Sequence, residues 1–227
     1  MNFEKIYNNG LKKGNIGSFW EGNIYEHVKD LLDFLEKNHP EERNRDSIKN
    51  LLFKFSDEIN QKIIGNYINQ GKVLDVGCGI CVLYEHLYEK DQYFGIDRFE
   101  EWFEFKPRDL SRERLLKLDL RKLEKLSESN FPREYSHIVD CLSTGRHLLG
   151  LRDFDFLKFF KKIDRILSKG GRYYFVDKYL SINRKDIQKI TESEYLSEER
   201  EIEVNCGKKP LTYFLLVFEK RKYSFFL

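Results

Sequence analysis

The residues best suited to chemistry lie in one short segment, in which an acid precedes a glycine-rich turn. The segment reads Val73-Leu74-Asp75-Val76-Gly77-Cys78-Gly79, an apolar run that ends in Asp-x-Gly-x-Gly. Glycines at such a turn let the backbone approach a ligand closely, and free N–H groups at the start of the following helix point towards it. The segment therefore predicts a site for a small polar ligand, although a plain tight turn between a strand and a helix would show the same pattern.

A second acid, Asp97, ends the next apolar run, Tyr93-Phe94-Gly95-Ile96-Asp97. A carboxylate at this place can accept two hydrogen bonds from a ribose diol, as it does in NAD-binding folds. The NAD fingerprint needs a third small residue, but Val82 stands there and would crowd the pyrophosphate. Asp75 would also repel a diphosphate, whereas it would attract a cationic amino-acid group. The two acids therefore favour a cationic cofactor with a ribose over NAD.

The rest of the chain predicts an α/β fold that positions these acids at one edge of a parallel sheet. Residues 1–70 show helical periodicity and no clear strand. From Gly71 onward, strand-like and helix-like runs alternate, which is typical of a parallel sheet with helices on both faces. Strands are expected at 73–76, 93–97, 115–119, 137–142 and 173–176, and helices at 82–88, 122–126 and 154–167, the last capped by Lys169-Gly170-Gly171.

The end of the chain departs from this alternation. A helix-like stretch at 184–196 is followed by two strand candidates, at 201–204 and 211–218. The linker 206–210 is too short for a helical crossover, so the two strands are expected to form an antiparallel hairpin.

Composition excludes several classes of protein. With 40 Lys and Arg against 38 Asp and Glu, the net charge of +2 gives no general attraction to nucleic acid or an anionic membrane. No stretch has the length of a membrane-spanning helix, and the N-terminus has no signal-peptide pattern. Reduced thiols and a cytoplasmic location are expected for the four cysteines, Cys78, Cys81, Cys141 and Cys206. The first two form a C-x-x-C, typical also of redox and zinc pairs, but no second pair or Cys/His cluster accompanies it, so no metal site is expected.

From about Gly71 to Phe218 the sequence resembles the class I S-adenosylmethionine-dependent methyltransferases. Their first motif is an acid followed by G-x-G-x-G, which here reads Asp75-Val76-Gly77-Cys78-Gly79-Ile80-Cys81, with Cys81 at the variable final glycine. The resemblance implies a Rossmann-like, seven-stranded, mostly parallel sheet with one antiparallel strand, which the terminal hairpin would supply. It also implies an enzyme that consumes S-adenosylmethionine and releases S-adenosylhomocysteine. Residues 71–227 would form its catalytic domain, and residues 1–70 a helical extension that acts as a lid or recognises the acceptor.

The resemblance assigns nine residues to cofactor binding. They lie at or just after the carboxyl ends of the first four strands: Asp75, Gly77, Cys78, Gly79, Asp97, Arg98, Asp119, Leu120 and Asp140. By resemblance, Asp75 orients the methionine amine and the glycines pass under the methionine and ribose. Asp97 would hold the ribose hydroxyls, with Arg98 near the adenine. Asp119 and the apolar residue after it would meet the adenine, and the backbone of Asp140 the methionine end.

The loop after the fourth strand faces the acceptor in this family. His147 resembles a histidine that many small-molecule methyltransferases carry there, and it is the candidate catalytic base, although a histidine that fixes the start of a helix would look the same. Arg146 either binds an anionic acceptor or is a solvated arginine. Asp177 and Tyr179 are further pocket candidates, whereas His137, inside a strand, is interpreted as structural.

The acceptor is expected to be an oxygen or nitrogen of a small molecule. The Asn/Asp-Pro-Pro-aromatic run of nucleic-acid amino-methyltransferases is absent, since Asp140 is followed by Cys141-Leu142-Ser143. No Pro-Cys pair and no basic run with interleaved aromatics is present, so nucleic acid is not expected as a partner. Two alternatives stay open: a macromolecular acceptor such as tRNA or protein, and a non-catalytic scaffold that binds the cofactor and acts through a partner.

Overall fold

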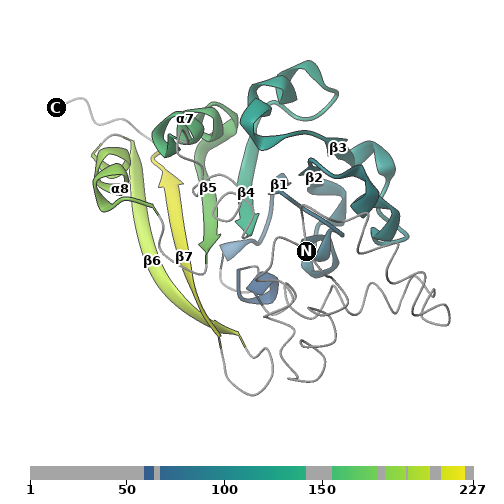
Figure 1. The fold of residues 1–227 in the computed structure, drawn as a ribbon, viewed down its shortest axis with the longest axis horizontal. Helices are drawn as coiled ribbons and strands as arrows, with labels where there is room; N and C mark the ends of the chain where they lie inside the picture. The colour runs from purple at the N-terminus through teal and green to yellow at the C-terminus, as the bar shows by residue number, and fades with distance from the viewer. Residues whose placement is uncertain are drawn as a thin grey trace, which may run out of the picture.

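The computed structural model contains one seven-stranded sheet with the order β3-β2-β1-β4-β5-β7-β6 (Figure 1). It describes residues 59–63, 67–141, 155–177, 182–192, 194–204 and 211–222. The strands are β1 (Val73–Val76), β2 (Tyr93–Asp97), β3 (Leu115–Lys117), β4 (Tyr135–Cys141), β5 (Leu167–Asp177), β6 (Tyr195–Val204) and β7 (Leu211–Lys220). Strands β3, β2, β1, β4 and β5 are parallel neighbours, and β7 is antiparallel to both β5 and β6. The predicted mostly parallel sheet with one antiparallel strand, and the hairpin that supplies it, are confirmed.

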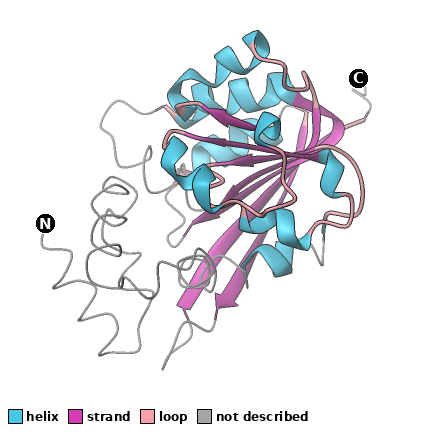
Figure 2. Ribbon diagram, turned by 90° about the vertical axis from the view of Figure 1, so that its right-hand side faces the viewer, coloured by secondary structure: helices cyan, strands magenta, loops and turns pink. Residues whose placement is uncertain are grey.

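Helices cover both faces of this sheet (Figure 2). The α-helices are α5 (Val82–His86), α7 (Phe156–Ile166) and α8 (Arg184–Thr191), and short 3-10 helices are η3 (Lys90–Gln92), η4 (Glu100–Phe105), η5 (Arg112–Arg114) and η6 (Leu120–Glu128). One core cluster joins the sheet to α5 and η4, and the other joins it to η6, α7 and α8. Ile59 and Ile63 are fully buried in the first cluster, so the chain just before Gly71 packs against the sheet. Residues 1–58, which make up most of the predicted N-terminal extension, lie outside the described residues.

Strand β1 explains why the central acid is buried. Successive side chains of a strand point to opposite faces. Val73 packs in the cluster that contains α5, and Leu74 and Val76 in the cluster that contains α7. Both faces are covered, as is typical of a parallel strand, and Asp75 lies among these apolar residues with only 5% of its surface exposed.

The predicted glycine cap of α7 is wrong. The helix ends at Ile166, before Gly170, and Leu167 already has an extended backbone that begins β5. The ammonium group of Lys220 donates hydrogen bonds to the carbonyls of Asp164 (2.8 Å) and Leu167 (3.3 Å). Because a side chain from β7 satisfies carbonyls at this helix end, no glycine is needed there.

The helix predicted at 184–196 also ends earlier, at Thr191, and β6 begins at Tyr195. The Tyr195 ring packs edge-on against Phe160 with 4.9 Å between centroids, and its hydroxyl donates to Asp164. Tertiary contact with α7 therefore places this tyrosine in the strand, against the helical pattern of its neighbours.

Candidate functional site

The loop between β1 and α5 holds backbone conformations that favour glycine. Gly77 and Gly79 have φ values of 71° and 51°, and Cys81 shares this left-handed region at 64°. The N–H groups of Gly77 and Cys78 both donate to the carbonyl of Ile96 in β2, at 2.8 and 3.0 Å. A Cβ atom built on Gly79 would meet no atom within 4 Å, so open space lies beside this residue. The loop is therefore anchored to β2 below and open to a ligand at Gly79.

Asp97 holds the same loop from the end of β2. Its Oδ2 accepts a hydrogen bond from the Gly79 N–H at 3.0 Å, and its Oδ1 accepts one from the Phe99 N–H at 2.9 Å. The side chain is 6% exposed. Each carboxylate oxygen has a further lone pair, so the group can accept hydroxyl donors in addition to these two amides.

Asp75 is paired with a tyrosine that the sequence reasoning missed. The Tyr93 hydroxyl donates to its Oδ2 at 2.9 Å, and both side chains are buried. Asp75 lies opposite Gly95 in the parallel register of β1 and β2. Tyr93 is two residues before Gly95 and lies on the same face of the sheet. Gly95 has no side chain, which leaves room for the Tyr93 hydroxyl, because a Cβ atom on Gly95 would lie only 3.1 Å from that hydroxyl.

A second tyrosine pairs diagonally with an acid on the neighbouring strand, between β4 and β5. The Tyr173 hydroxyl donates to Oδ2 of Asp140 at 2.8 Å, and neither side chain is exposed. Asp140 is in register with Phe175, again two residues after the tyrosine. A tyrosine two positions before the residue opposite an acid is thus the sequence signal for both pairs, but it becomes visible only when the strand register is known.

Burial shapes the charge of these carboxyl groups. Burial raises the pKa of Asp75 to about 7, against the lowering effect of the Tyr93 hydrogen bond. It raises the pKa of Asp97 to about 6, although the Phe99 and Gly79 amides lower it. The pKa of Asp75 is raised further by the charges of Asp97 and Asp140. A cluster of this kind accepts a cation readily, because a positive charge restores ionisation of the carboxyl groups.

The three remaining predicted cofactor residues lie beside this cluster with other partners. The Arg98 guanidinium lies 4.4 Å from the centre of the Phe99 ring. Asp119 caps η6 by accepting the Arg121 N–H at 2.9 Å and forms an ion pair with the Arg121 side chain, which lowers its pKa. Leu120 is partly buried against the core cluster of α7. The predicted contacts of these residues with an adenine remain predictions.

Several acceptor-side predictions fall outside the described residues. These are the candidate base His147, its neighbour Arg146, and Tyr179. Asp177 ends β5 and is 4% exposed. His137 lies within β4, where Nδ1 is 2.9 Å from the Tyr174 hydroxyl and Nε2 is 3.0 Å from the Gln70 carbonyl, as expected of a structural histidine.

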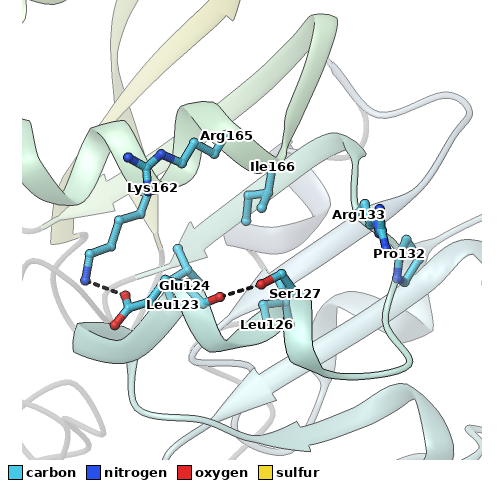
Figure 3. Close-up of a pocket in the computed structure, with 9 residues that line it drawn as sticks. All are labelled: Leu123, Glu124, Leu126, Ser127, Pro132, Arg133, Lys162, Arg165 and Ile166. Carbon is cyan, nitrogen blue, oxygen red and sulfur yellow. Dashed lines mark hydrogen bonds and ion pairs between the residues drawn. The ribbon is translucent and has the colours of Figure 1, made fainter.

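A separate hollow of about 370 Å³ lies at the other end of the strands, where β4 and β5 begin (Figure 3). The ion pair between Glu124 and Lys162 (2.7 Å) crosses one side of it, and Arg133 and Ile166 form other parts of its wall. None of the predicted site residues lines this hollow. The glycine loop, and not this hollow, is therefore the candidate functional site.

Comparison with known families agrees with this geometry. Residues 74–175 match the family model of a methyltransferase domain, a range that runs from β1 to β5 and includes the glycine loop and the buried acids Asp75, Asp97 and Asp140. The chain carries a class I S-adenosylmethionine-dependent methyltransferase domain. The predicted family, enzyme class and methyl donor are thereby confirmed. No curated protein matches the sequence of this methyltransferase.

Solved structures share the fold of the methyltransferase at low sequence identity. An S-adenosylmethionine-dependent methyltransferase from Archaeoglobus fulgidus is 13% identical with a TM-score of 0.53, and the match covers 84% of this chain and 99% of that one. The N-methyltransferase NodS from Bradyrhizobium japonicum, in complex with S-adenosylhomocysteine, is 13% identical with a TM-score of 0.52, covering 73% and 86%. The 1,6-didemethyltoxoflavin N1-methyltransferase from Burkholderia thailandensis is 14% identical with a TM-score of 0.51, covering 87% and 90%. These likenesses support the Rossmann-like architecture.

The described residues contain neither a membrane-spanning helix nor a cluster of metal ligands. None of the helices in this part of the chain is both long and apolar enough to cross a membrane. No group of three or more His, Cys, Asp or Glu side chains among the same residues has the arrangement of a metal site.

Proposed function

We propose that the methyltransferase moves the methyl group of S-adenosylmethionine to an oxygen or nitrogen of a small molecule, by in-line displacement. The assignment of the cofactor rests on the glycine loop, which is open at Gly79 and held by Asp97. The acceptor class is supported by the 1,6-didemethyltoxoflavin N1-methyltransferase, which shares the fold and was crystallised with bound 1,6-didemethyltoxoflavin and S-adenosylhomocysteine.

The buried acids suit the two polar ends of this cofactor. Asp75, whose pKa burial raises to about 7, would be ionised by the methionine ammonium group, and the resulting ion pair would hold the amino-acid end. Asp97 would accept the ribose hydroxyls through the lone pairs that Gly79 and Phe99 leave available. Glycine at position 79 lets the backbone lie close to the cofactor, because no side chain fills the adjoining space.

The bound cofactor would supply an electrophilic methyl group on a sulfonium centre. The residues of the chain then have to bind and orient the cofactor and the acceptor and to exclude water, since positioning provides much of the rate of such a displacement. Asp140 has its carboxylate fixed by Tyr173, which would keep the end of β4 rigid next to the reacting groups. His147, by resemblance, would accept a proton from the acceptor or bind it.

Calorimetry with S-adenosylhomocysteine, with NAD as the competing ligand, tests the cofactor assignment. We expect binding of the former only; binding of NAD alone would refute the assignment. Release of S-adenosylhomocysteine is then assayed across small amines, hydroxylated aromatics, carboxylates and bulk tRNA. Turnover confined to tRNA would refute the small-molecule acceptor and support the macromolecular alternative.

The role of His147 has its own test. We expect His147→Ala to lower turnover about 100-fold or more, the usual contribution of a general base, while the affinity for S-adenosylhomocysteine stays unchanged. His137→Ala is the matched control, because that histidine contacts Tyr174 and Gln70 inside the sheet and should affect stability instead. Unchanged turnover of the His147 variant would remove it from the catalytic machinery.

A further inference from the structure

Cys78 and Cys81 bring two thiols together inside the cofactor loop. Their Sγ atoms are 3.9 Å apart, and neither thiol is in a disulfide. The Cys81 N–H donates to the Cys78 carbonyl at 2.8 Å, which closes a reverse turn. The ends of such a turn lie within about 7 Å between Cα atoms, a range that overlaps the roughly 4.4–6.8 Å of disulfides. The backbone of the loop is therefore already close to the separation that a disulfide needs.

The two thiols are largely buried, and the described residues around them do not form a metal site. Cys81 is fully buried, and Cys78 is 8% exposed. Cys78 Sγ lies over Gly95, where a built Cβ atom would be only 2.8 Å away. Among the described residues, no group of three or more His, Cys, Asp or Glu side chains could hold a metal ion, so none of these residues completes a zinc site with the two thiols.

We propose that Cys78 and Cys81 form a reversible disulfide by exchange with a low-molecular-weight disulfide, and that this bond weakens cofactor binding. The second part rests on the proposed function. One thiolate attacks the small disulfide, forms a mixed disulfide and releases one small thiolate. The second protein thiolate then attacks the protein sulfur of the mixed disulfide and releases the other small thiolate. The two cysteines lose two electrons and two protons, and the small disulfide is reduced to two thiols.

We expect closure of this bond to tighten the loop between the two cysteines. The S–S distance of a disulfide is about 2.05 Å, so the two sulfur atoms have to approach each other by almost half their present separation. Gly79 lies between the two cysteines, and its N–H is fixed on Asp97 at 3.0 Å. Tightening the turn shifts Gly79 and strains this hydrogen bond. A shifted Asp97 carboxylate would also lose its proposed contact with the ribose. We therefore expect affinity for S-adenosylhomocysteine to fall about tenfold, the effect of losing one hydrogen bond between the ligand and a charged group.

The cofactor should in turn protect the thiols. The thiolate is the reactive form, and burial raises the pKa of Cys78 above its usual range. Exchange is therefore slow while the loop keeps this conformation and faster when it opens. A cofactor that lies on the loop opposes opening, so it should slow formation of the disulfide.

The experiment incubates the full chain with oxidised glutathione and maps disulfides by mass spectrometry after alkylation of the remaining thiols. We expect a Cys78–Cys81 bond that dithiothreitol reverses, that forms more slowly with S-adenosylhomocysteine, and that weakens binding of this ligand about tenfold in calorimetry. The variant Cys141→Ser with Cys206→Ser keeps only the loop pair and should behave alike. Cys81→Ser should instead stop at the mixed disulfide of Cys78 with glutathione.

Two results would overturn the proposal. One is full alkylation of both loop cysteines after prolonged exposure to oxidised glutathione; the other is a Cys78–Cys81 bond that leaves the affinity for S-adenosylhomocysteine unchanged. Binding by the reduced protein is measured in the same series, so failure of the proposed function appears separately, as a reduced protein that does not bind.

Discussion

Asp97 offers the sharpest test of the site, because its carboxylate accepts hydrogen bonds from two amides and is proposed to accept another from the ribose. We choose Asp97→Asn, which keeps the shape of the side chain and removes its charge. One oxygen can still accept an N–H, but the new amide nitrogen faces the other donor, either Gly79 N–H at 3.0 Å or Phe99 N–H at 2.9 Å. The substitution therefore leaves one buried donor without an acceptor and weakens the proposed ribose contact.

The magnitude follows from these contacts. A hydrogen bond to a charged group contributes about 1.5–3 kcal/mol, so losing one between Asp97 and the ribose raises Kd about 10- to 150-fold. The unpaired donor lowers the free energy of unfolding by about 1–3 kcal/mol. Calorimetry with S-adenosylhomocysteine measures the first effect, and urea unfolding without ligand measures the second. The matched control is Glu100→Gln, which removes an exposed carboxylate paired with Arg112 at 2.6 Å and should change either quantity little.

The pH dependence separates the two roles of Asp97. Its pKa is about 6, so affinity in the natural protein should fall as pH decreases through 6, because the protonated carboxyl loses acceptor capacity. The Asn variant should lack this part of the pH dependence. An unchanged Kd in a folded Asp97→Asn protein would refute the ribose assignment and leave Asp97 as a residue that only holds the loop.

Four further outcomes are expected. Gly79→Ala should weaken cofactor binding while costing about 1 kcal/mol of stability, because its Cβ meets no protein atom but its φ is 51°; calorimetry and urea unfolding check this. Gly95→Ala should mainly lower the thermal midpoint, since its Cβ would lie 2.8–2.9 Å from Cys78 and Leu115 atoms. Tyr93→Phe should shift the pH midpoint of cofactor binding upward, because it removes the hydrogen bond that lowers the pKa of Asp75; a Kd series across pH 6–8 tests this. Lys220→Met should lower the free energy of unfolding by about 1–3 kcal/mol, as carbonyls at the end of α7 lose their donor; unchanged urea unfolding would contradict that account.

Much of the fold could be predicted because the strands of the sheet are short apolar runs between turn residues. The bounds of β1 and β2 match the expected 73–76 and 93–97, and the terminal hairpin follows from a linker too short for a crossover. The errors in the ends of helices lie where contacts with side chains distant in sequence determine where the helix stops. Lys220, more than 50 residues after the end of α7, bonds to carbonyls there, and Phe160 packs against Tyr195 of β6. A local sequence pattern contains neither contact.

The positions of the acids near the glycine loop could also be predicted from the sequence, whereas their roles towards the cofactor stay predictions. Acids at strand ends are visible in sequence, so Asp75, Asp97 and Asp140 were all expected near the loop. Their tyrosine partners were not, because the pairing of Tyr93 with Asp75 depends on which residue lies opposite the acid in the neighbouring strand.

The buried acids also show how the site and the stability of the fold are connected. The pKa of Asp75, about 7, lies above the value of about 3.9 in an unfolded chain, so the folded protein binds this proton more tightly. Its contribution to stability is therefore complete below pH 4 and is lost as pH rises through 7. Asp97 acts in the same direction up to about pH 6. At neutral pH the ionised carboxylates of Asp75 and Asp97 thus oppose folding. A cationic ligand would stabilise the ionised form of Asp75, so part of the cofactor's binding energy would offset a cost already present in the sheet.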